Sequence, residues 1–195
     1  VLLNLLGTPG GKKVKQEYSI PKWIMKSPKW YKRLFLASLF GAELSSPKTA
    51  TDHDFNFYCP IYSINKDNIL DGMNFVNQIS ILLEEFEVKS ALIKNRIDEI
   101  NGKKTNRIRL MIYSEPTNLI SLYSNINYEY NLKKRKLANA AILWINQKEK
   151  IINFRQETMA KAREMKVQGH TKSQIIDTLS SEYSNKYFID KAIYY

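Results

Sequence analysis

The stretch Phe35-Leu36-Ala37-Ser38-Leu39-Phe40-Gly41-Ala42-Glu43-Leu44 has the pattern of a helix that carries a strip of small side chains. Ala37 and Gly41 are four residues apart, as are Ser38 and Ala42, and residues at this spacing are neighbours on a helix surface. Glycine costs about 1 kcal/mol relative to alanine inside a helix, which indicates that another backbone approaches closely. The sequence therefore predicts a tightly packed helix pair with Ala37, Ser38, Gly41 and Ala42 at the contact.

A lone carboxylate, Glu43, follows this strip near the end of a helix expected over 29–44. The helix dipole disfavours a negative charge at a C-terminal end. In one interpretation a helix pair brings one carboxylate from each partner to a shared divalent metal ion. In the other, the helices simply pack and the acid is exposed to solvent.

The composition is strongly basic, with a net charge of +11 and a pI near 9.6. Residues 1–33 carry a net charge of +7 and residues 133–172 a net charge of +8. Two such segments point to a polyanionic partner, usually nucleic acid, although solvated helix faces are the alternative. The single cysteine, Cys59, excludes a disulfide framework. No apolar run approaches membrane-span length and no signal peptide is evident, so we expect a cytoplasmic protein without a membrane partner.

Hydrophobic periodicity predicts alternating helices and strands that together form an α+β fold with an antiparallel sheet. The Asn101-Gly102 pair is a strong hairpin signal between two of the strands. Strands are expected over 54–65, 88–97 and 105–113, and further helices over 69–86, 116–125 and 131–153.

The expected hairpin places basic residues opposite each other if Asn101 and Gly102 form its turn, so that paired residue numbers sum to 203. Arg96 then faces Arg107, and Lys94 faces Arg109. Like charges directly opposite destabilise a sheet, and an anionic ligand would relieve that conflict. A β-ribbon fits the DNA major groove, where Arg and Lys read guanine. The alternative is a frayed hairpin tip whose long side chains splay into solvent.

Five stretches of the chain resemble the LAGLIDADG (DOD-type) homing endonucleases, and Leu36 to Leu44 fall on the nine motif positions in order. The resemblance is greatest to endonucleases of inteins that interrupt the archaeal tRNA-splicing RNA ligase. Leu44 and Ser38 stand where the motif has glycines. The stretches are FLASLFGAEL within KRLFLASLFGAELSSPKT (32–49), YSIPKWI (18–24), FNFYCPIYSINK (55–66), LLEEF (82–86) and YEYNLKKRKLANAAI (128–142).

This resemblance implies one αββαββα repeat over 21–153, whose sheet forms a saddle on double-stranded DNA. It also implies a second such repeat, located either upstream in the full chain or in a homodimer partner. Glu43 is then the acid that binds Mg²⁺, and Lys66 and Lys94 are candidate catalytic or phosphate-contacting lysines. The candidate DNA-contacting residues of this repeat are Lys48, Lys94, Arg96, Arg107 and Arg109.

The remaining segments are expected to be separate from this repeat. Residues 1–20 are interpreted as a linker or the end of a preceding unit. Residues 157–195 resemble a truncated helix-turn-helix unit, in which Thr171 to Gln174 match a capping box. Asn185, Lys186 and Lys191 would face the DNA groove in this interpretation. The alternative is a small helical hairpin that packs on the main domain.

The resulting expectation is a Mg²⁺-dependent, site-specific double-strand DNA endonuclease encoded by an intein, with either one half or the whole of its active site on this chain. A non-catalytic DNA- or RNA-binding protein on the same fold, such as a maturase or a regulator, is the first rival. A purely structural basic protein is the second.

Overall fold

The computed structural model of the chain describes residues 5, 7, 12, 14–51, 56–93, 97–100 and 102–194, without the side chains of Ile93, Ile100 and Lys103. The chain divides into two compact units, 1–145 and 146–195. The first unit contains α2 (Lys22–Met25), α3 (Lys29–Glu43), β1 (Ile61–Lys66), α4 (Ile69–Glu84), β2 (Ser90–Ile93), β3 (Ile97–Ile100), β4 (Lys103–Ile112), α5 (Pro116–Ser121) and a π-helical turn, η1 (Leu122–Ile126). Helix α6 (Leu132–Val167) passes into the second unit, which also holds α7 (Lys172–Leu179) and α8 (Lys186–Tyr194).

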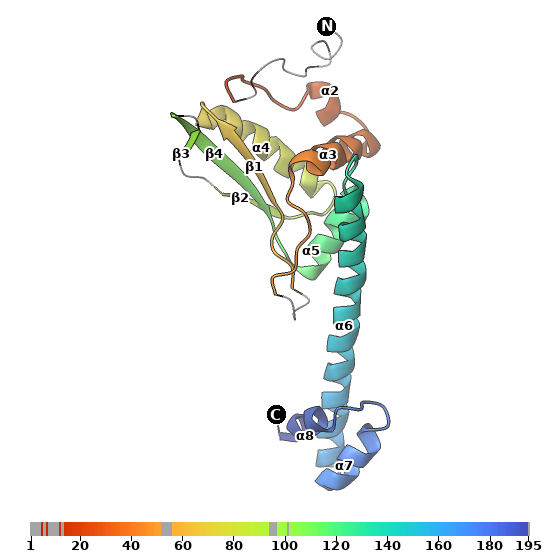
Figure 1. Cartoon of the computed structure of the whole chain (residues 1–195). Helices are drawn as coiled ribbons and strands as arrows, with labels where there is room; N and C mark the ends of the chain where they lie inside the picture. Colours follow the sequence, from red (N-terminus) through yellow and green to blue (C-terminus); the bar gives the residue numbers. More distant parts are fainter. Residues whose placement is uncertain are drawn as a thin grey trace. The chain divides into compact units, whose positions relative to one another are not determined.

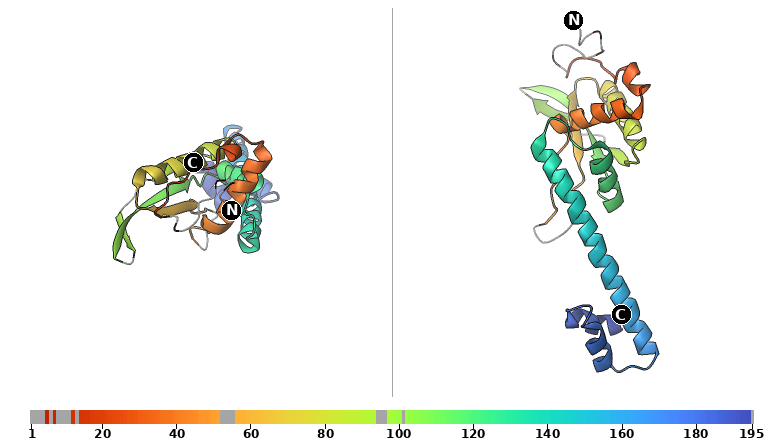
Figure 2. Two further views of the ribbon diagram at one scale, coloured as in Figure 1. Left: turned by 90° about the horizontal axis from the view of Figure 1, so that it is seen from above. Right: turned by 90° about the vertical axis from the view of Figure 1, so that its right-hand side faces the viewer.

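The first unit is built on an antiparallel sheet with the strand order β1-β4-β2, and β3 also pairs with β4 (Figure 1). This confirms the expected α+β class and the antiparallel sheet. Inward-facing side chains alternate along the strands, because successive residues of a strand point to opposite faces. Tyr62, Ile108, Leu110 and Ile112 are buried on the inner face. Helices α3 and α4 contact the sheet strands from that side (Figure 2).

The hairpin register differs from the expectation beyond residues 94–96. Near the turn the predicted register holds, from Ile100 opposite Lys103 to Ile97 opposite Asn106. Farther along, however, Ile93 lies opposite Arg109. Between these two pairs, three residues (94–96) lie along one strand and two residues (107–108) lie along β4. A β-bulge produces this difference in count. The predicted pairing of Lys94 with Arg109 is wrong, and Lys94, Arg96 and Asn101 themselves lie outside the described residues.

The expected strand over 54–65 begins later than predicted, at Ile61. Residues 56–60 instead run beside the segment that follows α3, with the amide of Tyr58 donating to the carbonyl of Lys48 at 3.0 Å. Thr49 and Phe57 form an isolated antiparallel bridge there. Residues 52–55, including Phe55, lie outside the described residues.

The described part of the expected N-terminal linker, from residue 14 onward, belongs to the first unit. Ile20 is 1% exposed, and its amide donates to the Gln78 side chain at 2.7 Å. The Tyr18 and Phe75 rings pack edge to face with centroids 4.8 Å apart. Treating 1–20 as a linker was therefore wrong for this part, because the apolar pattern of Tyr18 and Ile20 is too short to reveal burial.

The predicted boundary between 153 and 157 falls inside helix α6, which is continuous from Leu132 to Val167. The sequence 146–167 contains no glycine or proline that would end a helix. The division between the units lies instead between Ile145 and Asn146, within the same helix. Among the described residues, no helix is both long enough and apolar enough to span a membrane.

Candidate functional site

The small residues of α3 contact a loop of the same chain. The amide of Glu129 donates to the carbonyl of Ala37 at 2.9 Å. A Cβ atom added at Gly41 would lie 1.9 Å from the carbonyl oxygen of Glu129. The close approach that the glycine indicated is therefore real, but the approaching backbone is the segment around Glu129. The assignment of Ala37 and Gly41 to a contact with a partner helix was wrong.

The other half of the strip remains accessible. Ser38 is half-buried and Ala42 is exposed. A groove of about 410 Å³ runs along this side of α3. It is lined by Trp23, Ile24, Tyr31, Leu34, Phe35, Ser38 and Leu39. The side of α3 with Ser38 and Ala42 is therefore the part of the small-residue strip that stays open to solvent.

Glu43 is exposed at the last position of α3, beside a lysine that the sequence analysis did not single out. The ammonium of Lys134 lies 2.6 Å from the carbonyl of Leu44 and 3.1 Å from that of Gly41. It also contacts the Phe40 and Ala42 carbonyls at 3.4 Å each. Lys134 therefore caps the C-terminal end of α3 from another helix.

Asn131 joins the same two helix ends. Its side-chain oxygen accepts from the amide of Lys134 at 3.1 Å, which caps the start of α6. Its side-chain amide donates to the Gly41 carbonyl at 3.0 Å. A single side chain thus satisfies backbone groups of both α3 and α6, and it fixes Lys134 relative to the helix that carries Glu43.

The charges at these two helix ends are opposite to those that the helix dipoles favour. Helix α3 ends on Glu43 with no basic residue in its last turn, and α6 begins with the basic run from Lys133 to Lys136. A cation is disfavoured at an N-terminus and an anion at a C-terminus. Because the two ends meet, the charge of one offsets the dipole of the other. Burial lowers the pKa of Lys134 from its ordinary value, and the nearby Glu43 carboxylate partly opposes that shift.

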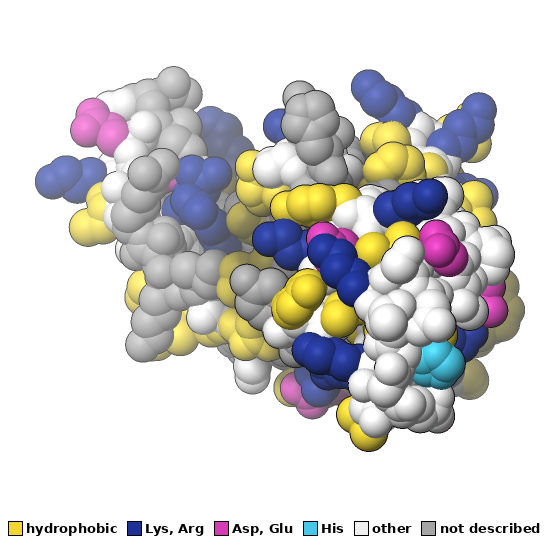
Figure 3. All heavy atoms as spheres, turned by 90° about the horizontal axis from the view of Figure 1, so that it is seen from below, with side chains coloured by type: hydrophobic (Ala, Val, Ile, Leu, Met, Phe, Trp, Pro, Cys, Tyr) yellow, Lys and Arg dark blue, Asp and Glu magenta, His cyan; other side chains and the backbone are white. Residues whose placement is uncertain are grey.

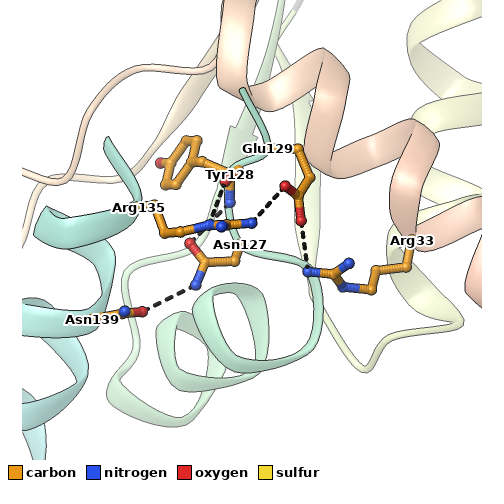
Figure 4. Close-up of polar contacts among 6 residues, drawn as sticks. All are labelled: Arg33, Asn127, Tyr128, Glu129, Arg135 and Asn139. Carbon is orange, nitrogen blue, oxygen red and sulfur yellow. Dashed lines mark hydrogen bonds and ion pairs between the residues drawn. The ribbon is translucent and has the colours of Figure 1, made fainter. Parts of the chain in front are cut away.

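A clamp of charged side chains holds this junction together (Figure 4). The Glu129 carboxylate accepts from Arg33 of α3 at 3.3 Å and from Arg135 of α6 at 2.5 Å. Arg135 also donates to the Tyr128 carbonyl at 3.1 Å, and Asn127 donates to Asn139 at 3.1 Å. Because Arg135 directly follows Lys134, the clamp positions the lysine against the end of α3.

A cavity of about 530 Å³ opens beside Glu43 and is lined also by Tyr18, Tyr62, Ser63 and Asn65. Burial raises the pKa of Tyr62 above its ordinary range, and it raises that of Tyr18 as well. The Glu43 carboxylate adds to both shifts. Both phenols therefore stay protonated at neutral pH, so the Glu43 side of the cavity carries hydroxyl groups rather than further anions.

Lys66 is buried and paired in this structure rather than a free cation. Its side chain is 1% exposed, and its ammonium pairs with Asp71 at 2.7 Å. It also donates to the Gln16 carbonyl and lies 3.7 Å from the Tyr18 ring centroid. These contacts give Lys66 a structural role that an alternation pattern does not reveal, and its catalytic or phosphate-contacting role stays a prediction.

The candidate DNA-contacting residues of the first unit are distributed over two regions. Arg107 and Arg109 lie on the outer face of β4, where Arg107 pairs with Asp98 at 3.3 Å. The Nε of Arg109 is buried and has no hydrogen-bond partner among the residues that the structure describes. Lys48 is exposed in the segment that follows α3, with its ammonium 6.0 Å from the Tyr58 ring centroid. Lys94 and Arg96 lie outside the described residues.

In the second unit, Lys186 and Lys191 are exposed on α8 as expected. Asn185 has another role, because its side chain accepts from the amide of Phe188 at 3.0 Å and caps that helix. The predicted capping box is confirmed, with the Thr171 and Gln174 side chains both in place at the start of α7.

The donors at the end of α3 can be compared with what Mg²⁺ requires. Among the described residues, no three His, Cys, Asp or Glu side chains cluster as a metal-binding group. Glu43 supplies one exposed carboxylate, while Lys134 and Asn131 occupy the neighbouring carbonyls. Mg²⁺ is commonly held by one or two carboxylates together with water and phosphate oxygens. The residues therefore fit Mg²⁺ if a second carboxylate or a DNA phosphate completes its coordination.

Sequence reasoning missed Lys134, Asn131 and Glu129. The available signal was the basic run at 133–136, placed where a helix dipole disfavours cations. Glu43 is the reverse case, an anion at the C-terminal end of a helix. The two unfavourable charges together indicate that the end of α3 and the start of α6 lie side by side. Glu129 contacts Gly41 through its backbone carbonyl, and its carboxylate pairs with two arginines. No pattern in the sequence around Glu129 predicts these contacts.

Comparison with known proteins gives similarity to segments of longer archaeal proteins. The chain is 32% identical over its full length to the tRNA-splicing ligase RtcB of Pyrococcus furiosus, of which it covers 19%. It is 34% identical over 80% of its length to the DNA-directed RNA polymerase subunit Rpo1N of Methanocaldococcus jannaschii, covering 11% of that protein. It is 33% identical over 67% of its length to the replication factor C small subunit of the same organism, covering 7%.

The chain thus spans about a fifth of the length of the tRNA-splicing ligases that it matches. The comparison confirms the expected similarity to a segment of archaeal tRNA-splicing ligases. No family model matches the chain. No solved structure matches it either.

Proposed function

We propose that the chain is one repeat of a Mg²⁺-dependent, site-specific DNA endonuclease of the LAGLIDADG type, carried as an insertion within host proteins. The observation that carries the proposal is the junction of α3 and α6. It presents an exposed carboxylate, Glu43, beside a partly desolvated ammonium, Lys134, held by carbonyls of the same helix end. Such a pair suits a phosphodiester, whose hydrolysis needs cations at the phosphate and an acid that holds a metal ion.

The similarities favour an insertion over a part of a ligase. Related segments occupy a minor share of a ligase, of a polymerase subunit and of a replication factor subunit. The names of these three proteins describe different activities, so the shared segment need not contribute to any of them. An intein-encoded endonuclease that inserts itself into several genes accounts for this distribution, and it matches the resemblance of the α3 motif.

Each group has a defined role in this proposal. Glu43 would hold Mg²⁺, which when bound lowers the pKa of a coordinated water and stabilises charge on the phosphate. Lys134 would place its positive charge near the phosphate, while its ammonium hydrogens stay on the carbonyls at the end of α3. Arg107 and Arg109 on the outer face of β4 would contact the duplex. A second repeat, from a homodimer or elsewhere in the full protein, would pack against the apolar groove beside Ser38 and supply the second carboxylate.

The test is cleavage of a plasmid that carries the uninterrupted RNA ligase gene, with a plasmid carrying a scrambled site as control. We expect Mg²⁺-dependent nicking or linearisation of the first plasmid only. Glu43→Gln should abolish cleavage and retain binding, since it removes the charge of one exposed residue. The matched control is Glu85→Gln, an acid paired with Lys32 on the surface. Equal cleavage by wild type and Glu43→Gln would contradict the proposal.

The second candidate is a non-catalytic nucleic-acid-binding protein on the same fold. The observation that favours it is the single carboxylate, because the described residues contain no complete metal-binding group. It predicts specific binding without cleavage at any Mg²⁺ concentration, whether or not a second repeat is supplied. In that case Glu43→Gln leaves the function unchanged.

A further inference from the structure

We infer that the C-terminal unit, residues 146–195, is a second duplex-DNA-binding element in which α8 reads the major groove. The inference extends the proposed function, because it concerns a surface that the endonuclease site does not use. It begins from the packing of the three helical segments. Residues of α6, α7 and α8 share one apolar cluster, and the members that are fully buried are Ala162, Ile175, Leu179, Ile189, Ala192 and Ile193.

The joints between these helices are fixed by polar contacts. Lys166 of α6 donates to the Ile193 carbonyl of α8 at 2.9 Å. Lys172 at the start of α7 pairs with Asp190 of α8 at 2.6 Å. The Tyr183 ring in the connection between α7 and α8 packs against the Phe188 ring at 5.0 Å. Short helices joined by a turn and held in this way form a helix-turn-helix arrangement, whose second helix is the one that enters a groove.

The exposed face of α8 has the chemistry that a duplex requires. Its outward residues are Lys186, Tyr187, Lys191 and Tyr194. The Lys191 ammonium lies 5.5 Å from the Tyr187 ring centroid, so the two side chains are held together on this face. The acid on this helix, Asp190, is half-buried and already neutralised by Lys172. Figure 3 shows Lys and Arg side chains beside hydrophobic ones on the face of the unit turned to the viewer.

Duplex DNA is favoured over RNA by shape. A helix fits the major groove of B-form DNA, whereas the A-form major groove of RNA is too deep and narrow for side chains to read. The residues expected to contact DNA are Lys186, Tyr187 and Lys191. Asn185, which the sequence suggested as well, uses its side-chain oxygen to cap α8, so it is left out of the tested set.

The experiment measures the binding of full-length protein to a mixed-sequence 30-base-pair DNA duplex between 50 and 200 mM salt, in EDTA. Lys186→Ala and Lys191→Ala are compared with Lys150→Ala, which removes one exposed lysine from α6 in the same unit. Each α8 variant should weaken binding several-fold and reduce the slope of log affinity against log salt by about 0.9, the value for one lost phosphate contact. Lys150→Ala should leave the slope unchanged. Tyr187, which is 71% exposed, can be replaced by alanine as a third variant without disturbing the core.

Equal effects of all three lysine variants would overturn the inference, because they would indicate diffuse attraction. No effect of the α8 variants, or tighter binding to an RNA duplex of the same sequence, would overturn it as well. Failure of the endonuclease proposal gives a different result. Binding in EDTA does not involve Glu43, so the contrast between α8 and Lys150 would persist in a protein that never cleaves DNA.

Discussion

The ammonium group of Lys134 lies 2.6 Å from the carbonyl oxygen of Leu44, the first residue beyond helix α3. This contact joins the start of α6 to the end of the helix that carries Glu43. It places one cation where carbonyl groups lack intrahelical partners. Because this ammonium group is partly desolvated, it loses its proton at a lower pH than an ordinary lysine does.

Cleavage should therefore decline on the alkaline side with a midpoint below 10.5, the ordinary pKa of lysine. Burial lowers the pKa of Lys134, with Glu43 opposing, so the charged form is lost earlier as the pH rises. Lys134→Arg should remove this decline, because arginine stays charged throughout the range. Single-turnover cleavage rates between pH 7 and 10 measure the effect, and an unchanged alkaline limb in the arginine variant would refute the role of Lys134.

The lowered pKa of Lys134 also determines whether the free energy of unfolding rises or falls with pH. The folded state binds its proton at Lys134 less tightly than the unfolded chain does, so the contribution of this group to stability rises as the pH increases from the folded pKa to 10.5. Urea unfolding of wild type relative to Lys134→Arg isolates that contribution from the buried tyrosines. A difference that falls with rising pH in this window would have the wrong sign.

Gly41→Ala should destabilise the first unit although alanine is the better helix former. Propensity alone would add about 1 kcal/mol of stability. The new methyl group would instead lie 1.9 Å from the backbone carbonyl of Glu129, which cannot rotate away as a side chain can. Overpacking of this kind costs about 1–3 kcal/mol or more, so the clash should exceed the gain. Chemical denaturation checks the sign, with Ser38→Ala on the accessible side of α3 as the control.

Helix α3 illustrates what the sequence could predict and what it could not. Its bounds, 29–43, are within one residue of the expectation, because apolar periodicity and Pro47 are local signals. The glycine correctly indicated a close approach. Its partner could not be identified, since Glu129 lies 88 positions away and contacts Gly41 through a backbone carbonyl that carries no side-chain signature.

The strand register shows a second limit. The Asn101-Gly102 signal predicted the pairing of 97–100 with 103–106 correctly, because turn geometry fixes register nearby. On the far side of 94–96 the register differs by one residue, and Ile93 lies opposite Arg109. A change of register depends on tertiary packing and leaves no sign in an alternation pattern. The sequence alone therefore could not show whether the four basic residues of the hairpin lie opposite one another.

Lys66→Met should unfold the first unit rather than inactivate a folded enzyme. The substitution leaves the Asp71 carboxylate, 10% exposed, without its partner at 2.7 Å. Breaking a buried pair by removing one partner costs about 3–5 kcal/mol. Thermal unfolding measures the loss, and Lys161→Met, which breaks an exposed pair with Glu182, should change stability little. A stable Lys66→Met variant that binds DNA and does not cleave would instead support a catalytic role for Lys66.

Arg109→Ala should reduce duplex binding more than Arg107→Ala, although both arginines lie on the outer face of β4. Arg107 is already paired with Asp98 at 3.3 Å, so part of its charge is neutralised before DNA arrives. The buried Nε of Arg109 has no hydrogen-bond partner among the described residues, and no described acid pairs with its guanidinium group, so its charge is available to a phosphate at the terminal nitrogens. We expect Arg109→Ala to lower the salt slope by about 0.9, and Arg107→Ala to lower it by less. Neither variant should lose stability, because Arg109 makes no compensating contact through Nε and the Arg107 pair is partly solvated. Equal slopes for the two variants would show that Asp98 does not shield Arg107, and an unchanged slope for both would remove β4 from the DNA-binding surface.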